Sequence, residues 1–201
     1  MSSVEEHMPL FMPGETYPIM LLRDALSLQE YAVKLHNEFP PDERQIPRAE
    51  RAPARAAIFM AFNMVESLLI DLTQECISSD TSNQICICCK DKIKNELKGG
   101  KGSIVNTIKD WPRMLGKTAI TEIAYFDSDR FDAIRNFRNQ LIHPKLELPV
   151  DSTAPSQDDL LRQCTEANAQ AIIHDLVKTA KALYTIFGKP IPVEFTTVVP
   201  S

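Results

Sequence analysis

The sequence predicts an all-α fold, a helical bundle of four to five core helices with an additional N-terminal helix. Apolar residues recur every three or four positions over most of the chain, as they do on one face of a helix. No alternation of strand-like and helix-like segments indicates a parallel sheet, and no internal repeat is evident. With 201 residues, 44% of them hydrophobic and 24% charged, the chain is long enough to bury a core in one domain.

The N-terminal region, residues 1–53, is expected to form an arm, one helix and a proline-rich linker. Residues 1–18 hold three prolines and a glycine, which favour an extended arm. The first helix is predicted from about Met20 to Phe39, where two prolines end it, and residues 41–53 are expected to be the linker. A second helix, from about Ala54 to Ser78, has a very wide apolar face, which predicts a central place in the core.

A shorter helix is predicted after Cys86, running through Leu97 to a glycine-rich loop at residues 98–103. The loop lacks the order of residues found in a phosphate-binding loop, and it follows a helix where that motif follows a strand. We therefore expect a simple turn, with Ser103 capping the next helix.

Two further segments, 104–111 and 117–126, are expected to be separated by a break at Pro112. They lead to Asp127, Ser128 and Asp129, which have the character of an acidic cap at the start of a helix. Another loop is expected at 144–155.

The last helix is predicted to open at Ser156 with a capping-box-like start and to run to Gly188. Its length of about 30 residues corresponds to roughly 45 Å at 1.5 Å per residue, which suits a bundle or a subunit interface. The C-terminal tail, 189–201, is expected to be an arm or a short docked strand. The predicted organisation is thus an N-terminal region 1–53, a helical domain 54–188 and the tail.

Charge and cysteine content indicate the class of protein and its compartment. The formal net charge of −5 argues against nucleic-acid binding through a broad basic surface, so any such site must be local. No stretch approaches the ~20 consecutive apolar residues that span a bilayer, and the N-terminus lacks the pattern of a signal peptide. Five cysteines, an odd number, suit a reducing compartment. We expect a cytoplasmic protein without membrane contact.

The stretch from Arg135 to Pro144, Arg-Asn-Phe-Arg-Asn-Gln-Leu-Ile-His-Pro, is the strongest candidate for chemistry. On a helix Arg135, Asn139 and His143 follow one another on one face, with Arg138 beside Arg135. Pro144 disfavours helix at His143, which places the imidazole at a helix end. An arginine holds a phosphate and a histidine exchanges protons near neutral pH, so the pair suits metal-free phosphodiester cleavage.

The spacing of Arg138, Asn139 and His143 resembles the arginine-x(4–6)-histidine motif of the HEPN superfamily, in which a polar residue usually follows the arginine. The resemblance covers about residues 54–187. It implies a helical bundle and a metal-independent endoribonuclease that leaves a cyclic phosphate. His143 would be the general acid or base, Arg138 would stabilise the transition state, and Asn139 would orient the phosphate or the imidazole.

The same resemblance implies accessory residues and partners. Glu66, and Asn63 three positions before it, lie in the apolar helix, and Glu66 is a candidate partner of Arg138; a solvent-facing polar stripe is the other interpretation. Arg135 and Lys145 would be accessory phosphate contacts. Arg130 is a further member of this local basic cluster. HEPN ribonucleases usually dimerise so that two motifs share a cleft, which predicts a homodimer acting on RNA, in a toxin–antitoxin, phage-defence or RNA-processing setting with an antitoxin as a further partner.

Blander alternatives remain open for each of these features. Basic residues commonly end helices because they complement the helix dipole, and some HEPN-like domains are non-catalytic modules that bind proteins or RNA. The pair Cys86 and Cys89 has the spacing of a zinc or redox site, but no second pair accompanies it, so we expect buried or half-buried thiols. His174 is expected to be a packing or surface residue. No cofactor and no metal site are predicted.

Overall fold

The computed structural model describes residues 16–39, 50–81, 84–99, 104–142 and 157–198. Throughout these residues the regular structure is helical, which confirms the predicted all-α bundle. The elements are α1 Tyr17–Glu38, α2 Arg51–Ser78, α3 Ile87–Gly99, α4 Ile104–Met114, a 3-10 turn Ile120–Glu122, α5 Ser128–Ile142, α6 Gln157–Arg162, α7 Glu166–Ile186 and α8 Val193–Val198.

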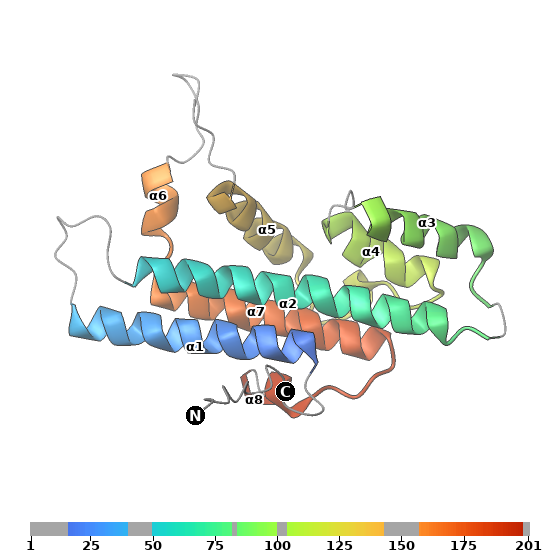
Figure 1. The fold of residues 1–201 in the computed structure, drawn as a ribbon, viewed down its shortest axis with the longest axis horizontal. Helices are drawn as coiled ribbons and strands as arrows, with labels where there is room; N and C mark the ends of the chain where they lie inside the picture. The colour runs from blue at the N-terminus through green and yellow to red at the C-terminus, as the bar shows by residue number, and fades with distance from the viewer. Residues whose placement is uncertain (1–15, 40–49, 82–83, 100–103, 143–156, 199–201) are drawn as a thin grey trace, which may run out of the picture.

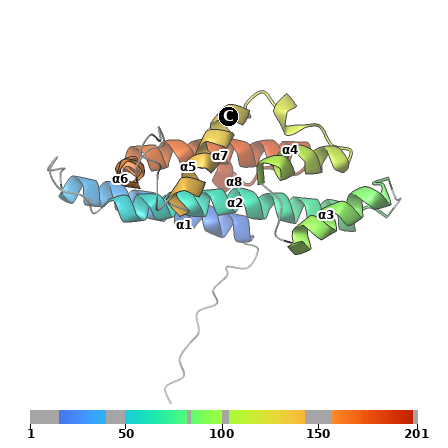
Figure 2. The ribbon, with the colours of Figure 1, turned by 90° about the horizontal axis from the view of Figure 1, so that it is seen from above.

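Three long helices, α1, α2 and α7, lie side by side and form the centre of the fold (Figure 1). Helices α3 to α6 lie on one side of this layer and α8 lies on the other. Seen from above, α5 crosses over α2 and α7 (Figure 2). One hydrophobic core joins α1, α2 and α7 with residues of α3, α4, α5 and α8, so the N-terminal helix belongs to the same core as the predicted domain 54–188.

Helix α2 has 28 residues, of which 13 are buried, and it contributes more to the core than its neighbours in the middle of the chain, as its wide apolar face predicted. It is also the one helix in the described part of the chain with the length and apolar content to cross a membrane, and 56% of that apolar stretch is buried inside the protein. A central core helix of a soluble bundle has the same character. Because the burial is against α1 and α7, we interpret α2 as the core helix.

Both N-terminal helices begin three residues earlier than expected. Pro18 and Pro53, which were assigned to the arm and to the linker, lie in the first turns of α1 and α2. A proline is tolerated there because the first N–H groups of a helix have no intrahelical acceptor.

The predicted break at Pro112 is also wrong, since α4 continues to Met114. The helix ends because Gly116 follows it with a φ of 70°, in the left-handed region of backbone conformation. The Lys117 N–H donates to the Pro112 carbonyl at 2.8 Å and the Gly116 N–H donates to the Arg113 carbonyl at 3.0 Å. These are the two bonds of a Schellman cap, which only a glycine adopts without strain.

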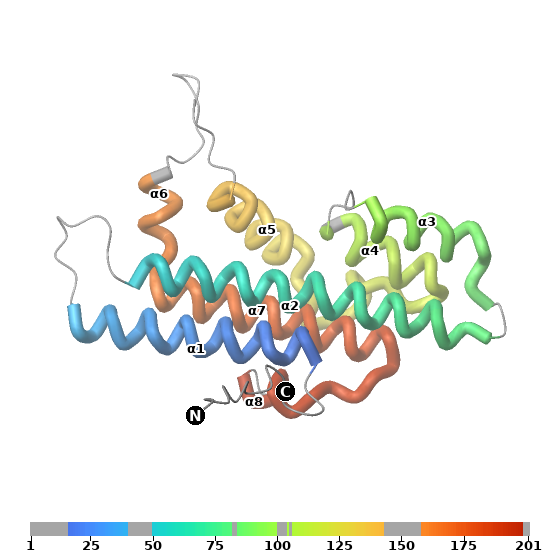
Figure 3. The backbone as a smooth tube through the Cα atoms, viewed as in Figure 1, coloured from blue at the N-terminus to red at the C-terminus, as the bar shows by residue number. Residues whose placement is uncertain are grey.

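The long C-terminal helix is two helices, not one. Figure 3 shows α6 turned away from the axis of α7. Thr165 caps α7 by accepting the Asn168 backbone N–H at 3.1 Å, and the Asn168 side chain donates to the Gln163 carbonyl at 2.8 Å. At 21 residues α7 is about 32 Å long instead of the expected 45 Å.

The C-terminal tail forms α8, a short helix where an arm or strand was expected. Its Phe195 is fully buried and meets the ring of Tyr184 edge-on at 5.5 Å. Several expectations lie outside the described residues: most of the arm, most of the linker, the glycine loop from residue 100 with its Ser103 cap, the 144–155 loop and the cap at Ser156.

Candidate functional site

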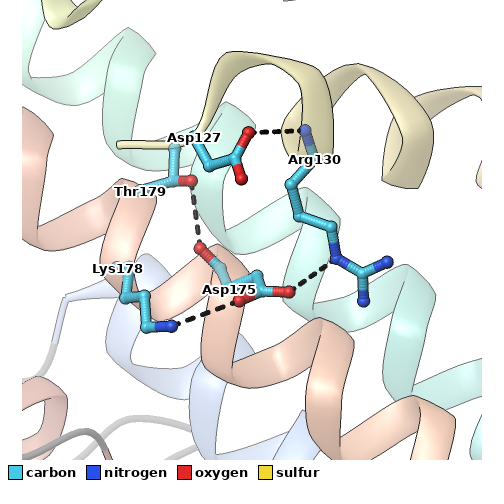
Figure 4. A network of polar contacts seen from close by, with 5 residues as sticks. All are labelled: Asp127, Arg130, Asp175, Lys178 and Thr179. Carbon is cyan, nitrogen blue, oxygen red and sulfur yellow. Dashed lines mark hydrogen bonds and ion pairs between the residues drawn. The ribbon is translucent and has the colours of Figure 1, made fainter. Parts of the chain in front are cut away.

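Helix α5 carries the arginine motif, and its N-terminus is fixed by an acidic cap as predicted. The Asp127 carboxylate accepts the backbone N–H of Arg130 at 2.9 Å (Figure 4). This satisfies one of the N–H groups that a helix leaves unpaired at its start, and the carboxylate also complements the helix dipole.

A polar network ties the same end of α5 to α7. The Arg130 Nε donates to Asp175 Oδ2 at 2.7 Å, and Asp175 also pairs with Lys178 at 3.4 Å (Figure 4). Thr179 donates to the Asp175 backbone carbonyl at 3.1 Å. The Nε of Arg130 is thus bonded to Asp175, which ties α5 to α7.

Aromatic packing sets the face that α5 turns toward α2. Phe131 is buried and stacks on Phe62 of α2, with ring centroids 5.9 Å apart and planes 16° apart. The rings of Phe126 and Phe131 are also in contact, with centroids 5.9 Å apart and planes tilted by 47°. Because Arg138 follows Phe131 by seven residues, two helical turns, it lies on this same face and also reaches Phe62.

The guanidinium of Arg138 lies over the Phe62 ring, with its carbon 5.2 Å from the ring centroid. This is a cation–π geometry. Its Nη1 donates to Asn139 Oδ1 at 3.1 Å, while its Nε is buried and has no hydrogen-bond partner within the described residues. Arg138 is therefore held in place by a ring and a neighbouring amide, with one donor left unused.

Glu66 lies one helical turn after Phe62 on α2 and is half-buried. Burial raises the pKa of Glu66, and the positive charge of Arg138 opposes that rise. The two side chains thus interact through their charges. Asn63, three residues before Glu66, is also half-buried. Both side chains are thus partly buried and partly exposed to solvent.

The other predicted residues are distributed as follows. Arg135 is half-buried and donates to Asn136 Oδ1 at 2.9 Å. Asn139 accepts the hydrogen bond from Arg138 and is otherwise exposed to solvent. His143 and Lys145 lie outside the described residues, directly after the last described residue of α5, Ile142.

A hollow of about 210 Å³ opens beside Glu66, between α2, α3 and α4. Glu66 and Glu96 supply its acidic groups, and Trp111 contributes both a wall and a bond from its indole N–H to Glu96 at 2.7 Å. The apolar remainder of the lining consists largely of leucine and isoleucine side chains. Glu66 therefore interacts with the charge of Arg138 and also lines this hollow.

Sequence reasoning missed Phe62 as the support of Arg138. The available signal was its position four residues before Glu66, which puts both on one face of α2. Without a structure, an aromatic residue in a core helix has no feature that separates a cation–π contact from ordinary packing.

Two groups of side chains in the described residues have the composition and spacing to hold a metal ion. One joins the ends of three helices, where His36 Nδ1 lies 3.7 Å from Glu50 and 3.6 Å from Glu166. The three atoms that face one another there, His36 Nδ1, Glu50 Oε1 and Glu166 Oε2, are buried. The other consists of Cys86, Cys88 and Cys89, at the start of α3.

Comparison of the chain with protein-family models, with curated proteins and with solved structures found no match.

Proposed function

We propose that this chain is a HEPN-like, metal-independent endoribonuclease that acts on RNA as a homodimer. The observation that carries the proposal is the placement of Arg138, which is anchored over Phe62 and keeps one buried guanidinium N–H without a hydrogen-bond partner in the described structure. It lies five residues before His143 in the sequence. A guanidinium N–H without a protein partner is a donor that a phosphate oxygen would accept from once the side chain turns toward it.

The division of roles follows from the chemistry of each side chain. His143 exchanges the proton of the ribose 2′-hydroxyl or of the leaving oxygen. The deprotonated 2′-oxygen attacks the phosphorus, and the bond to the 5′-oxygen of the next nucleotide breaks as that oxygen takes up a proton, which leaves a 2′,3′-cyclic phosphate and a 5′-hydroxyl. Arg138 stabilises the charge that develops on the phosphorus oxygens. Asn139 holds the guanidinium in orientation through its bond to Nη1.

Glu66 and the Phe62 ring would act as positioning groups in this scheme. The ring fixes the distance of Arg138 from α2, and the carboxylate holds the guanidinium in place by charge. Asn63, Arg135 and the adjacent Lys145 are accessory contacts to the RNA backbone. A local cation cluster of this size is compatible with a net charge of −5, because one or two phosphates need only a few contacts.

A homodimer supplies what one chain lacks. Cleavage needs two proton transfers, and each chain brings one motif histidine, so two motifs facing one cleft provide both. Ile142, at the end of α5, is 38% exposed and would be covered in such a pair. The cytoplasm is the compartment we expect, and an antitoxin-like protein is the natural restraint on such an activity.

A non-catalytic interaction module is the competing function. The observation in its favour is the set of exposed aromatic side chains on and just after α1: Tyr17 at 56%, Tyr31 at 52% and Phe39 at 63%. Exposed aromatics of this kind are enriched in protein interfaces.

The deciding experiment measures cleavage of a defined single-stranded RNA in EDTA by four purified proteins: wild type, His143→Ala, Arg138→Lys and Arg113→Ala. Arg113 is an exposed arginine on α4 and serves as the matched control. We expect the first two variants to lose about 100-fold or more of the activity, because each removes a proton carrier or the forked cation. The control should retain it.

Arg138→Lys keeps the charge and a cation over the ring, so a role confined to folding would leave cleavage unchanged in that variant. The products should carry cyclic phosphate ends, and all four proteins should have the same oligomeric state. Absence of cleavage by the wild type, or equal cleavage by all four, would refute the nuclease and leave the interaction module as the better account.

A further inference from the structure

Three cysteines gather at the turn that leads into α3. Each pair among the sulfurs of Cys86, Cys88 and Cys89 lies within 4.8 Å. The Cys86 and Cys88 sulfurs are 2.7 Å apart, and the Cys89 backbone N–H donates to the Cys86 sulfur at 3.2 Å. Sequence reasoning considered only the Cys86–Cys89 pair and expected buried or half-buried thiols, whereas Cys86 and Cys88 are exposed and Cys89 is half-buried.

The turn is held in shape by groups other than the thiols. Asp80, just after α2, accepts the backbone N–H groups of Gln84 and Ile85 at 2.9 and 3.0 Å. It also pairs at 2.8 Å with Lys90 in the first turn of α3, and the two side chains are only 6% and 14% exposed. An ion pair this shielded from water is weakly screened by salt. The sulfurs are therefore presented by a fixed piece of backbone.

Groups at the start of α3 favour a thiolate at Cys86. The Cys89 backbone N–H donates to the Cys86 sulfur at 3.2 Å, and the positive end of the α3 helix dipole lies at this turn. A bound cation would favour the thiolate form of all three sulfurs and release their protons to solvent.

We propose that Cys86, Cys88 and Cys89 form a binding site for a thiophilic divalent metal ion of the zinc class. Sulfur ligands select soft ions such as Zn²⁺ over Mg²⁺ or Ca²⁺. Three thiolates supply three of the four positions of a tetrahedral ion, and the exposure of Cys86 and Cys88 leaves the fourth open to solvent. Binding moves up to three thiol protons to water and makes three metal–sulfur bonds.

The distances fit with a small adjustment. At a zinc–sulfur bond of ~2.3 Å, tetrahedral ligands are separated by ~3.8 Å. All three sulfurs lie within 4.8 Å of one another, which includes this value, while Cys86 and Cys88, at 2.7 Å, must open by about 1 Å. Exposed side chains make that change by rotation about χ1 without moving the backbone.

The site is independent of the proposed nuclease, and the chain supplies a matched control. Cys76 is a half-buried thiol outside the trio, on α2. The variants to compare are wild type, Cys88→Ser, the triple Cys86→Ser, Cys88→Ser and Cys89→Ser protein, and Cys76→Ser. Helix content and Trp111 fluorescence report whether each variant is folded.

The experiment titrates metal-free, reduced protein with Zn²⁺, and with Cd²⁺ as a probe whose thiolate absorption reports sulfur ligation directly. We expect one ion per wild-type chain with thiolate absorption and proton release. Cys88→Ser should bind at least about tenfold more weakly, the triple variant should show no thiolate absorption, and Cys76→Ser should match the wild type. No binding by reduced wild type, or binding that survives in the triple variant with its thiolate signal, would overturn the proposal.

Discussion

The contact between Arg138 and Phe62 predicts a measurable coupling energy. The perturbation is a double-mutant cycle of Phe62→Leu and Arg138→Met, in which each change keeps an apolar side chain of similar length but removes the ring or the charge. Phe62 is 1% exposed and Arg138 is half-buried, with the guanidinium carbon 5.2 Å from the ring centroid. A cation–π pair at such a partly desolvated site contributes about 1 kcal/mol.

The single changes are less informative than the coupling. Phe62→Leu also loses the stack with Phe131, about 0.5–1.5 kcal/mol, and leaves some space in the core. Arg138→Met loses the cation–π contact, which lowers the free energy of unfolding. It also removes the buried Nε donor, whose missing hydrogen-bond partner costs the folded state about 1–3 kcal/mol. The net change in the free energy of unfolding is therefore small or stabilising. The difference between the double variant and the sum of the singles isolates the pair.

Urea unfolding followed by circular dichroism gives the four free energies of unfolding. We expect a coupling energy of about 1 kcal/mol for Phe62 with Arg138. The same cycle with the exposed Arg113 should be additive to within about 0.5 kcal/mol. A Phe62–Arg138 coupling no larger than that of the control would refute the placement of the guanidinium on the ring, and with it the support for Arg138 as a positioned cation.

The remaining predictions concern pH and the polar ties. The pKa of Glu66 is raised in the fold above its ordinary value of 4.5. As pH rises from 4.5, the wild type should therefore lose stability relative to Glu66→Gln. A difference in urea midpoint between the two proteins that does not change with pH would contradict this. Asp175→Asn should weaken the Arg130 tether, lowering the free energy of unfolding by about 0.5–1 kcal/mol because the pair is partly exposed, as urea titration would show. Lys90 and backbone N–H groups lower the pKa of Asp80 below 3.8, so the stability that its carboxylate adds should be present above pH 3.8 and lost as pH falls below it. Acid unfolding of the wild type and of Asp80→Asn checks this, and equal acid midpoints for the two proteins would refute it.

Local sequence signals predicted the elements that they alone determine. The wide apolar face placed α2 at the centre of the core, and the acidic residues before Arg130 identified the start of α5 through the Asp127 cap. The division at Thr165 was missed because the apolar pattern continues across it: Leu160 and Cys164 before it and Ala169 after it are all buried. The cap of α7 is formed by Thr165 and Asn168. Threonine and asparagine also occur inside longer helices, so their presence alone does not predict that a helix starts there.

Tertiary contacts account for what the sequence left undecided. Whether Glu66 faced water or an internal group depended on which side of α2 received α5, and the stack of Phe131 on Phe62 sets that side. Likewise, the motif arginines are alike in sequence, yet Arg130 is bound by Asp175 while Arg138 rests on a ring. Neither Asp175 nor Phe62 carries a local signal of its partner, because each partner comes from a distant part of the chain.

EDTA distinguishes the two proposals, because it would remove a metal from the cysteine trio and leave the arginine motif intact. The two sites are well separated along α2: Glu66 precedes Ser78, the last residue of that helix, by 12 residues, or about 18 Å. A metal at the start of α3 should therefore affect the packing of that helix and leave the chemistry at Arg138 unchanged. The triple serine variant should cleave RNA within about twofold of wild type, with or without EDTA. If chelation abolishes cleavage in both proteins, the cysteine trio is not the cause, and the metal-independent mechanism itself must be abandoned.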